Sequence, residues 1–535
     1  INYSVGTGDW LDAESFAQAG LVLIWGSNTL VTNRHLWPFV EQARTEGAPL
    51  FVVDPLRTRT AQRADGHLAP YPGTDGALAL GLSRAAVDRG GADERFLTER
   101  TEGWNHFEAR LAFWDLHRTS TVTGVPAADI ERLAEAIVAA PPLAVRIGHG
   151  IQRQAAGGEA MRTVACLPAV VGAYDLPGGG SLYSSSGTPK GYNLDRSRRP
   201  ELGERPRTLT MTNLGRNLTE LDDPPVEALI VYGANPMVSN PETELVRRGL
   251  EREDLFTVVI ELYPTETAAY ADLLLPSTMQ HEHIEINDSY NHRYLQWNEP
   301  AVAAPGACLP HTEIFRRLAA AMGYDEPALF ATDEELATDL LDSPTLADAG
   351  ITLDRLRRHG HLPLPPRADP HRRPFPTPSG RFEFASRRAE ADGHSLTAGY
   401  RPPAEAADAA GRNAMAAPGT DAPLALIAAA SDQHVNSTFA GTDAVRRRGD
   451  DPPLVLHPDD AAARAVGPGD LVWVANDRGG FSAVVTVSDR TRRGVAATTK
   501  GWWHHGLNAT VAERNADMAD GAVFHDNAVR VERLD

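Results

Sequence analysis

The apolar residues in the first 330 positions come in short uninterrupted runs, each followed by small residues and then by a helix-like pattern. Leu21–Trp25 reads LVLIW, and the small residues 26–28 come directly after it. Positions 33–46 favour a helix, and 51–53 favour a second strand. Uninterrupted apolar strands that alternate with helices are typical of parallel α/β sheets, because both faces of such strands are buried.

The same order returns near the middle of the chain. It consists of a strand over 229–232, a small-residue loop over 233–236, a helix that ends near 248 and a strand over 257–260. Shifting the sequence by 207 positions superposes the two stretches without a gap, with 12 identities in the 43 positions from 26 to 68. Self-similarity of this kind predicts a duplicated structural unit.

Each copy pairs a glycine with an acid 28 residues later: Gly26 with Asp54, and Gly233 with Glu261. At the carboxyl ends of parallel strands, a small-residue loop lets backbone N–H groups approach a phosphate, and an acid after a later strand can bind ribose or base. The pairing therefore predicts two nucleotide-binding sites. The G-x-G-x-x-G fingerprint is absent from both loops, which counts against an ordinary NAD or FAD site. In the alternative interpretation, the glycines only make turns and the acids only cap helices.

The last quarter of the chain has a different pattern, in which short apolar stretches alternate with turns rich in Gly, Pro and Asp. The stretches are 424–428, 454–456, 471–475, 481–487 and 494–499. This pattern predicts a compact β-barrel. Before it, a Pro/Arg-rich stretch (364–379) and an Ala/Gly-rich stretch (402–423) indicate loops. We divide the chain into a first dinucleotide-binding α/β domain, a second such domain, a connecting region and the barrel: residues 1–145, 146–330, 331–420 and 421–535.

Composition and charge narrow the range of functions. The 535 residues include 71 acidic and 51 basic side chains, and the net charge of −20 makes nucleic acid an unlikely partner because the surface repels phosphate backbones. The two cysteines, Cys166 and Cys308, exclude a four-cysteine iron–sulfur or zinc site within these residues. No apolar run is long enough to span a bilayer, so we expect no direct membrane insertion.

Ten phrases of the sequence follow one another in a fixed order along the whole chain. They are Trp25-Gly-Ser-Asn28, Val53-Asp-Pro55, Pro72-Gly-Thr-Asp75, Gly148-x-Gly-x-Gln152-Arg153, Pro177-Gly-Gly-Gly180, Tyr232-Gly-Ala-Asn-Pro236, Ala271-Asp272, Phe375-Pro-Thr-Pro-Ser-Gly380, His457-Pro-x-Asp-Ala461 and Asn476-x-Arg-Gly479. In this order they resemble the molybdopterin oxidoreductases of the dimethyl sulfoxide reductase and formate dehydrogenase superfamily. The resemblance implies an α/β fold with two pseudo-symmetric Rossmann-like dinucleotide-binding domains followed by a C-terminal β-barrel domain.

The resemblance also implies a cofactor, two molybdopterin guanine dinucleotides around one molybdenum or tungsten. The residues implied for the first guanosine diphosphate arm are Trp25, Gly26, Ser27, Asn28, Asp54, Pro55, Thr58, Gly73, Thr74 and Asp75. Those implied for the second arm are Gly233, Asn235, Pro236, Glu261, Thr265 and Asp272. Those implied near the pterins are Gly148 and Gln152, together with His434, Asn436, Ser437, Trp503, Asn508 and Asp526 of the barrel.

The resemblance implies further parts that we do not find in residues 1–535. Members of this family normally begin with a four-cysteine segment that binds a [4Fe-4S] cluster, and the Ser, Cys or selenocysteine that ligates the metal follows it. Both are expected before Ile1, so we name no catalytic residue and no metal ligand in this chain. A small-molecule substrate and an electron-transfer protein or subunit are the expected partners. We expect a cytoplasmic location, and a periplasmic one stays open because Ile1 is not a start residue.

The implied activity is a two-electron redox reaction or an oxygen-atom transfer on a small substrate: an S- or N-oxide, formate or an inorganic oxyanion. A cofactor-free structural subunit of a respiratory-type complex with the same fold is the alternative. It would predict decayed nucleotide loops, whereas both loops and both acids are present. A nicotinamide or flavin dehydrogenase is a third interpretation, which the missing glycine fingerprint disfavours.

Four other features have simpler interpretations. The run 281–285 (HEHIE) is the densest group of potential metal ligands, but its spacing is not H-E-x-x-H, and the resemblance implies an acidic wall of a substrate funnel at Glu282 or Glu285. The run 502–505 (WWHH) indicates a pterin-contacting turn or an aromatic surface patch. We expect Cys166 to be a small core residue, and we expect no nucleophilic role for Cys308, which lies in a Pro/Gly loop.

Overall fold

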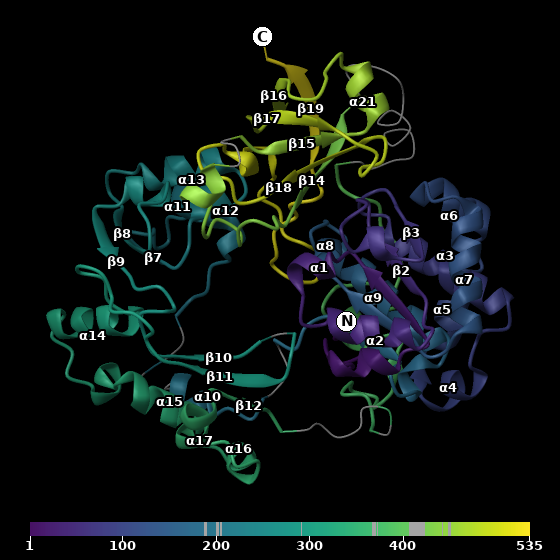
Figure 1. Ribbon diagram of the computed structural model, residues 1–535, viewed down its shortest axis with the longest axis horizontal. Helices are drawn as coiled ribbons and strands as arrows, with labels where there is room; N and C mark the ends of the chain where they lie inside the picture. Colours follow the sequence, from purple (N-terminus) through teal and green to yellow (C-terminus); the bar gives the residue numbers. More distant parts are fainter. Residues whose placement is uncertain are drawn as a thin grey trace.

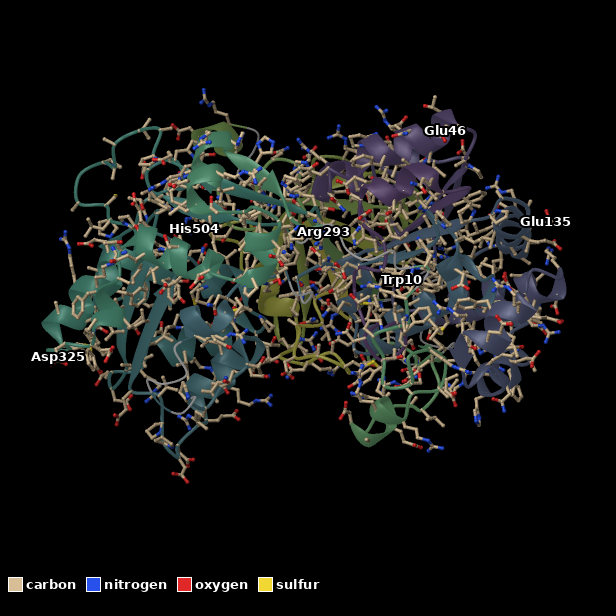
Figure 2. The ribbon with its side chains drawn as sticks, turned by 90° about the horizontal axis from the view of Figure 1, so that it is seen from below. Trp10, Glu46, Glu135, Arg293, Asp325 and His504 are labelled. Carbon is tan, nitrogen blue, oxygen red and sulfur yellow. The ribbon has the colours of Figure 1, made fainter. Side chains whose placement is uncertain are left out.

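The computed structural model has two lobes, with a barrel lying across the top of both (Figure 1). It describes residues 1–186, 190–198, 203, 206–289, 291–365, 371, 373–405, 423–440, 442–447 and 451–534. Most of the expected Ala/Gly-rich loop at 402–423 lies outside these residues. Seen from below, Trp10 lies in one lobe, Asp325 marks the far end of the other, and Arg293 lies between them (Figure 2).

The first lobe is built on a parallel sheet with the strand order β3-β2-β1-β5-β6. The strands are β1 (Leu21–Trp25), β2 (Leu50–Val53), β3 (Gly66–Leu68), β5 (Leu143–Ile147) and β6 (Gly180–Leu182). All five residues of β1 are buried, as the uninterrupted apolar run predicts. The expected strands and the α/β class of this lobe are confirmed.

Helices cover both faces of this sheet. They are α2 (Trp37–Thr45), α3 (Asp75–Asp88), α6 (Leu116–Thr123), α7 (Ala127–Ala139) and α9 (Gly157–Val170). The chain crosses from β1 to β2 in one direction and from β3 to β5 and β6 in the other, so right-handed crossovers place α2 opposite α3, α7 and α9. The helix expected over 33–46 is shorter than predicted, because Pro38 lies in the first turn of α2 and a separate turn, α1 (Thr29–Thr32), precedes it.

The first lobe extends past the domain boundary that we placed at 145/146. That boundary falls inside β5, which pairs with β1 over its whole length, and β6 then pairs with β5. The sequence pattern could not show this, because a buried strand looks the same whether it opens a new sheet or completes an old one. Residues up to Leu182 therefore belong to the first sheet.

The second lobe contains the other copy of the predicted unit. Its parallel sheet is β7 (Ala228–Tyr232), β8 (Phe256–Glu261) and β9 (Leu273–Pro276). Two helices, α11 (Leu214–Thr219) and α13 (Thr243–Leu250), pack together beside it. Apolar side chains lie exposed on the other face, among them Ile230, Tyr232, Phe256 and Leu273.

The region 331–420, expected to be a connection, takes part in both lobes. In the second lobe, α15 (Asp333–Leu341), α17 (Leu353–His359) and β12 (His361–Pro363) pack with an antiparallel hairpin, β10 (Glu285–Asn287) and β11 (Tyr294–Asn298). The chain then returns to the first lobe, where β13 (Phe382–Glu383) pairs with β4 (Thr101–Glu102). Phe375 stacks on Trp10 with 4.3 Å between ring centroids, so this region supplies part of the first core.

The predicted β-barrel is confirmed. Its closed strand order is β14-β18-β15-β17-β16-β19. Five of these strands match the expected stretches: β14 (Leu424–Ala429), β15 (Pro453–Leu456), β16 (Leu471–Asn476), β17 (Gly479–Val487) and β18 (Val495–Thr499). The sixth, β19 (Ala528–Arg533), was missed although its alternating sequence AVRVER is typical of a half-buried strand.

Candidate cofactor site

The candidate site lies where the carboxyl ends of both parallel sheets meet the lower end of the barrel. The turns α1, α8 (His149–Gln152) and α12 (Pro236–Ser239) converge there beneath β14 and β18 (Figure 1). Gly26, Asp54 and Gly148 follow β1, β2 and β5, while Gly233 follows β7 and Glu261 is the last residue of β8. The topology therefore brings both predicted glycine–acid pairs to this edge, which is where open α/β sheets bind ligands.

The first glycine loop is packed backbone against backbone. Gly26 has a φ of +62°, and its N–H donates to the Val53 carbonyl at 2.8 Å. The Gly148 N–H donates to the Trp25 carbonyl at 2.7 Å, and a Cβ at Gly148 would lie 1.9 Å from the Gly26 oxygen. Only glycine fits at position 148, so the two loops form one rigid edge. Beyond it, the side-chain oxygen Oε1 of Gln152 accepts a hydrogen bond from the Tyr183 hydroxyl at 2.6 Å.

The two glycine loops share the same hydrogen bonds, each related by the 207-residue shift. Thr60 Oγ1 bonds Asn28 Oδ1 at 3.0 Å, and Thr267 Oγ1 bonds Asn235 Oδ1 at 2.7 Å. The same hydroxyls accept the N–H groups of Leu30 and Met237, each at 3.1 Å. The predicted duplication therefore extends to individual atoms.

Further pairs follow the same shift. Gly233 has a φ of +57°, close to that of Gly26, and its N–H donates to the Ile260 carbonyl as that of Gly26 does to Val53. Thr58 Oγ1 accepts the Ala61 N–H at 3.2 Å, and Thr265 Oγ1 accepts the Ala268 N–H at 3.3 Å. The hydroxyls of both threonines therefore stabilise the turn that follows Asp54 in one copy and Glu261 in the other.

Asp272 does not lie with the other predicted residues. Its Oδ2 accepts the Thr257 N–H at 2.7 Å near the start of β8, and Asp65 does the same for Leu50 at 2.8 Å near the start of β2. Four strand residues, about 13 Å, separate Thr257 from Glu261 at the ligand edge. This matched aspartate closes the opposite edge of each sheet, so we remove Asp272 from the candidate site. Its identity in both copies reflects the fold.

The first lobe places two acids side by side at the site. Asp75 opens α3, directly after Gly73 and Thr74, and its Oδ1 accepts the Trp25 indole N–H at 2.8 Å. Burial raises the pKa of Asp75 to about 6 and that of Asp54 to about 7, and the charge on Asp75 adds to the second shift. Asp54 also accepts the Leu56 N–H at 2.9 Å, across Pro55.

The second lobe has a more open version of this arrangement. Glu261 accepts the Leu262 N–H at 2.7 Å, and burial raises its pKa above the ordinary value. Tyr232, which corresponds to Trp25, is 55% exposed whereas Trp25 is fully buried. The Glu261 side of the site is therefore more exposed to solvent than the Asp54 side, although the hydrogen bonds of the two glycine loops match.

Barrel residues predicted at the site fall into two groups. In the first, the His434 ring bonds the Asn436 carbonyl at 2.6 Å, and the Trp503 indole donates to the Ser437 carbonyl at 3.0 Å. Together with His504, which contacts Glu266, these residues form a loop pair over the second lobe. His434 is buried and its Nε2 has no hydrogen-bond partner in the described part of the chain.

The second group of barrel residues joins the domains. Asn508 donates to the Val238 carbonyl at 2.8 Å, next to Pro236 in α12. Asp526 accepts the N–H groups of Ala155, Ala404 and Glu405 at 3.2, 2.8 and 2.9 Å. Because these side chains already hold backbone groups, Asn508 and Asp526 act as anchors between the barrel and the lobes rather than as free ligand contacts.

A buried cationic cluster at the centre of the site was not predicted. Arg153, from the turn after α8, and Lys500, directly after β18, are half-buried, and no ion pair is found for either among the described residues. Burial lowers the pKa of His149 and that of His525 to about 4 each, and both cations lower them further. Unpaired buried cations are costly, so the cluster fits an anionic ligand. Arg153 stands in one of the ten phrases, but its role was not visible there.

The other sequence features give no site. Among the described residues, no group of three or more His, Cys, Asp or Glu side chains could hold a metal ion. In 281–285, Glu282 folds back on the Met279 N–H at 2.9 Å. Cys166 is fully buried as expected, and burial raises its pKa to about 12. No helix in the described ranges has the length and apolarity needed to cross a membrane.

Comparison with known families agrees with this geometry. The family profile Molybdopterin oxidoreductase matches residues 6–321, and that of the Molydopterin dinucleotide binding domain matches 424–528. The chain belongs to the molybdopterin oxidoreductase family. It is therefore a molybdopterin-dependent oxidoreductase of the dimethyl sulfoxide reductase and formate dehydrogenase superfamily, as the ten phrases indicated. The matched domains imply a molybdopterin dinucleotide cofactor.

Two relatives and one solved structure illustrate the similarity. "Probable oxidoreductase YoaE" of Bacillus subtilis is 35% identical over 99% of this chain and 77% of its own length. Dimethyl sulfoxide reductase DmsA of Escherichia coli is 26% identical over 100% of this chain and 74% of its own length. Acetylene hydratase from Pelobacter acetylenicus shares the fold, with a TM-score of 0.80 and 19% identity over 100% of this chain and 80% of that structure.

Proposed function

We propose that this oxidoreductase binds two molybdopterin guanine dinucleotides around one molybdenum or tungsten. The observation that supports two nucleotides, rather than one, is the atom-by-atom match of the hydrogen bonds around Gly26 and Gly233. Two equivalent loops at the carboxyl ends of two parallel sheets face the same barrel. A single nucleotide would leave one of these preformed edges without a ligand.

The chemistry of the side chains fits such a cofactor. Backbone N–H groups of the glycine loops suit a pyrophosphate, and Arg153 and Lys500 supply the positive charge that a chain with a net charge of −20 otherwise lacks. Asp54, Asp75 and Glu261 offer carboxyl oxygens that suit the paired N–H donors of a guanine edge. His434 Nε2 and Asn235 Nδ2 are buried polar atoms for which the described residues supply no hydrogen-bond partner, and a ligand atom can supply one.

When bound, the metal–pterin group supplies the electron-transfer chemistry. The residues of this chain then bind and orient it: the glycine loops hold the nucleotide arms, the cationic cluster holds anionic groups between lobe and barrel, and the barrel excludes water. We propose an S- or N-oxide, formate or an inorganic oxyanion as the substrate. The name of the relative DmsA supports the first of these classes. An electron-transfer protein or subunit is the proposed partner, and a [4Fe-4S] cluster outside residues 1–535 stays a prediction.

Cofactor content is the first test. The purified protein is analysed for Mo and W by plasma mass spectrometry, and acid hydrolysis is followed by chromatography of the released guanine nucleotides. We expect two guanine nucleotides per chain. One nucleotide per chain would contradict the pairing of the two loops, and none, with neither metal, would favour the cofactor-free structural subunit. A screen of sulfoxides, N-oxides, formate and oxyanions with a viologen dye as electron donor or acceptor then identifies the substrate.

A further inference from the structure

Two buried threonines, Thr60 and Thr267, lie behind the glycine loops. Thr60 and Thr267 have 0% exposure, and each hydroxyl lies between a backbone N–H and the side-chain amide of an asparagine. Neither threonine was predicted as a site residue. Their hydroxyls cannot reach solvent, so their only visible role is to hold the loop and the asparagine in place.

The hydrogen bonds fix which way the asparagine amides point. In the first lobe, the Thr60 backbone N–H also faces Asn28, at 3.3 Å from Oδ1. A backbone N–H can only donate, so the atom that it meets must be the carbonyl oxygen of the amide. The Nδ2 group of Asn28 is therefore the end that points away from Thr60.

The second lobe repeats this orientation. Thr267 Oγ1 accepts the Met237 N–H, so its own proton is available for Asn235 Oδ1 at 2.7 Å. Asn235 is 3% exposed, and its Nδ2 has no hydrogen-bond partner among the described residues. A buried N–H₂ group without a partner is costly, and native structures rarely leave one unsatisfied.

We propose that Thr60 and Thr267 are positioning residues that aim the Nδ2 groups of Asn28 and Asn235 at an oxygen acceptor of each bound nucleotide. The acceptor is a phosphate oxygen, a ribose oxygen or the guanine O6, because the guanine N1–H and N2–H₂ groups are donors and cannot pair with an N–H₂ group. This inference rests on the proposed function, because it takes the nucleotide arms as the ligands. It adds the atom that each loop offers and the residue that orients it.

The test uses isosteric substitutions and GDP as the probe. Thr267→Val and Thr60→Val each remove one hydroxyl, and the binding of GDP to cofactor-free protein is measured by isothermal titration calorimetry. We expect each variant to weaken one of two GDP sites by about tenfold, as the loss of one oriented hydrogen bond does. Thr267→Ser should restore the affinity. Asn235→Asp should weaken the same site further, because it replaces the donor by a charged acceptor.

A matched control comes from the same sheet. Thr257 is also 0% exposed, but its hydroxyl has no partner among the described residues and it lies at the opposite edge of β8. Thr257→Val should leave GDP binding unchanged. Melting temperatures of all cofactor-free variants show whether a loss of affinity merely follows a loss of stability.

The outcomes separate this inference from the function on which it rests. If the wild-type protein carries no guanine nucleotide and binds no GDP, the proposed function fails. If the wild-type protein binds two GDP molecules and the valine variants bind GDP as tightly as wild type, the positioning role is overturned. It is also overturned if Thr267→Ser and Thr257→Val weaken GDP binding as much as Thr267→Val does. Weakening seen with GDP but not with guanosine identifies a phosphate oxygen as the acceptor, and equal weakening with both identifies an oxygen of the ribose or of the base.

Discussion

At the scale of single residues, the candidate site combines carboxyls whose pKa burial raises with cations for which the described residues show no ion pair. Asp54 is the clearest case, because burial and the neighbouring Asp75 raise its pKa from 3.8 to about 7. The same low-solvent environment lowers the pKa of His149 and His525. Without the cofactor, these charged groups lack partners and lower the stability of the folded protein. The same groups favour the binding of a ligand that supplies the missing partners.

The raised pKa of Asp54 predicts a pH dependence of stability. A carboxyl whose pKa is higher in the folded state stabilises the protein below pH 4, and this contribution is lost as the pH rises from about 4 to about 7. In the cofactor-free protein, Asp54→Asn should remove that loss. Urea unfolding at pH 5 and pH 7.5 should show a gain for the variant at the higher pH, on the order of 1–3 kcal/mol relative to wild type.

The control for this prediction is Asp489→Asn, which changes an exposed carboxylate in the barrel. The wild-type and Asp489→Asn proteins should lose the same free energy of unfolding between the two pH values. If the Asp54→Asn protein lost as much free energy of unfolding between pH 5 and pH 7.5 as the wild type, the assignment of this pH dependence to Asp54 would be contradicted.

At the scale of elements, the loops after β1 and β5 are locked by direct backbone contact. Gly148→Ala would place a Cβ 1.9 Å from the Gly26 oxygen, so the two loops must separate. We expect a loss of about 1–3 kcal/mol in the free energy of unfolding and a lower nucleotide content per chain. Chemical denaturation and guanine-nucleotide analysis measure the two effects.

Gly467→Ala provides the comparison, because a Cβ there would meet only the Asp470 carboxylate, at 3.9 Å. This variant should keep wild-type stability and nucleotide content. Equal behaviour of the two alanine variants would show that the contact between the loops does not shape the site.

Local sequence signals predicted most strands and the paired loops, since these depend on short-range patterning. Leu21–Trp25 and Leu50–Val53 are unbroken apolar runs, and both are strands. Asp272, in contrast, was wrongly placed among the nucleotide contacts, although it holds the start of β8 as Asp65 holds the start of β2. The reason is that a duplicated fold preserves structural carboxylates as well as binding ones, and sequence alone does not tell at which edge of a sheet a residue lies.

At the scale of the whole molecule, long-range packing joins parts that no local pattern could pair. The cationic cluster needs Arg153 and Lys500 from opposite ends of the chain, and the first core needs Phe375 and Phe382 next to Trp10. The sequence could not predict these contacts, because each residue alone looks like an ordinary basic or aromatic position. Only the family resemblance carried long-range information.

Arg492 shows how the barrel is attached. From the turn before β18, its guanidinium donates to the Ala69 carbonyl, and to those of Thr123 and Gly124 at 3.3 and 3.4 Å, and it lies 3.6 Å from the Tyr71 ring centroid. Arg492→Met should lower the stability of the barrel docking by about 2–4 kcal/mol, because three carbonyls lose their donor. We expect the barrel and the first lobe to unfold in separate calorimetric transitions.

Arg490→Met removes an exposed guanidinium two residues earlier in the same turn and should leave a single transition. Coincident unfolding of barrel and lobe in the Arg492→Met protein would show that other contacts, such as those of Asp526, suffice to hold them together.

The pairing of β13 with β4 has a consequence for biosynthesis. Residues 375–384 complete the aromatic core around Trp10 and Tyr174, so the first lobe stays unfinished on the ribosome until residue 384 has emerged. The first lobe, although most of its residues precede those of the second lobe, is then among the later parts to close. A protein chain cut near residue 330 would lack this closing segment, and its first sheet would present an open aromatic surface to chaperones and proteases.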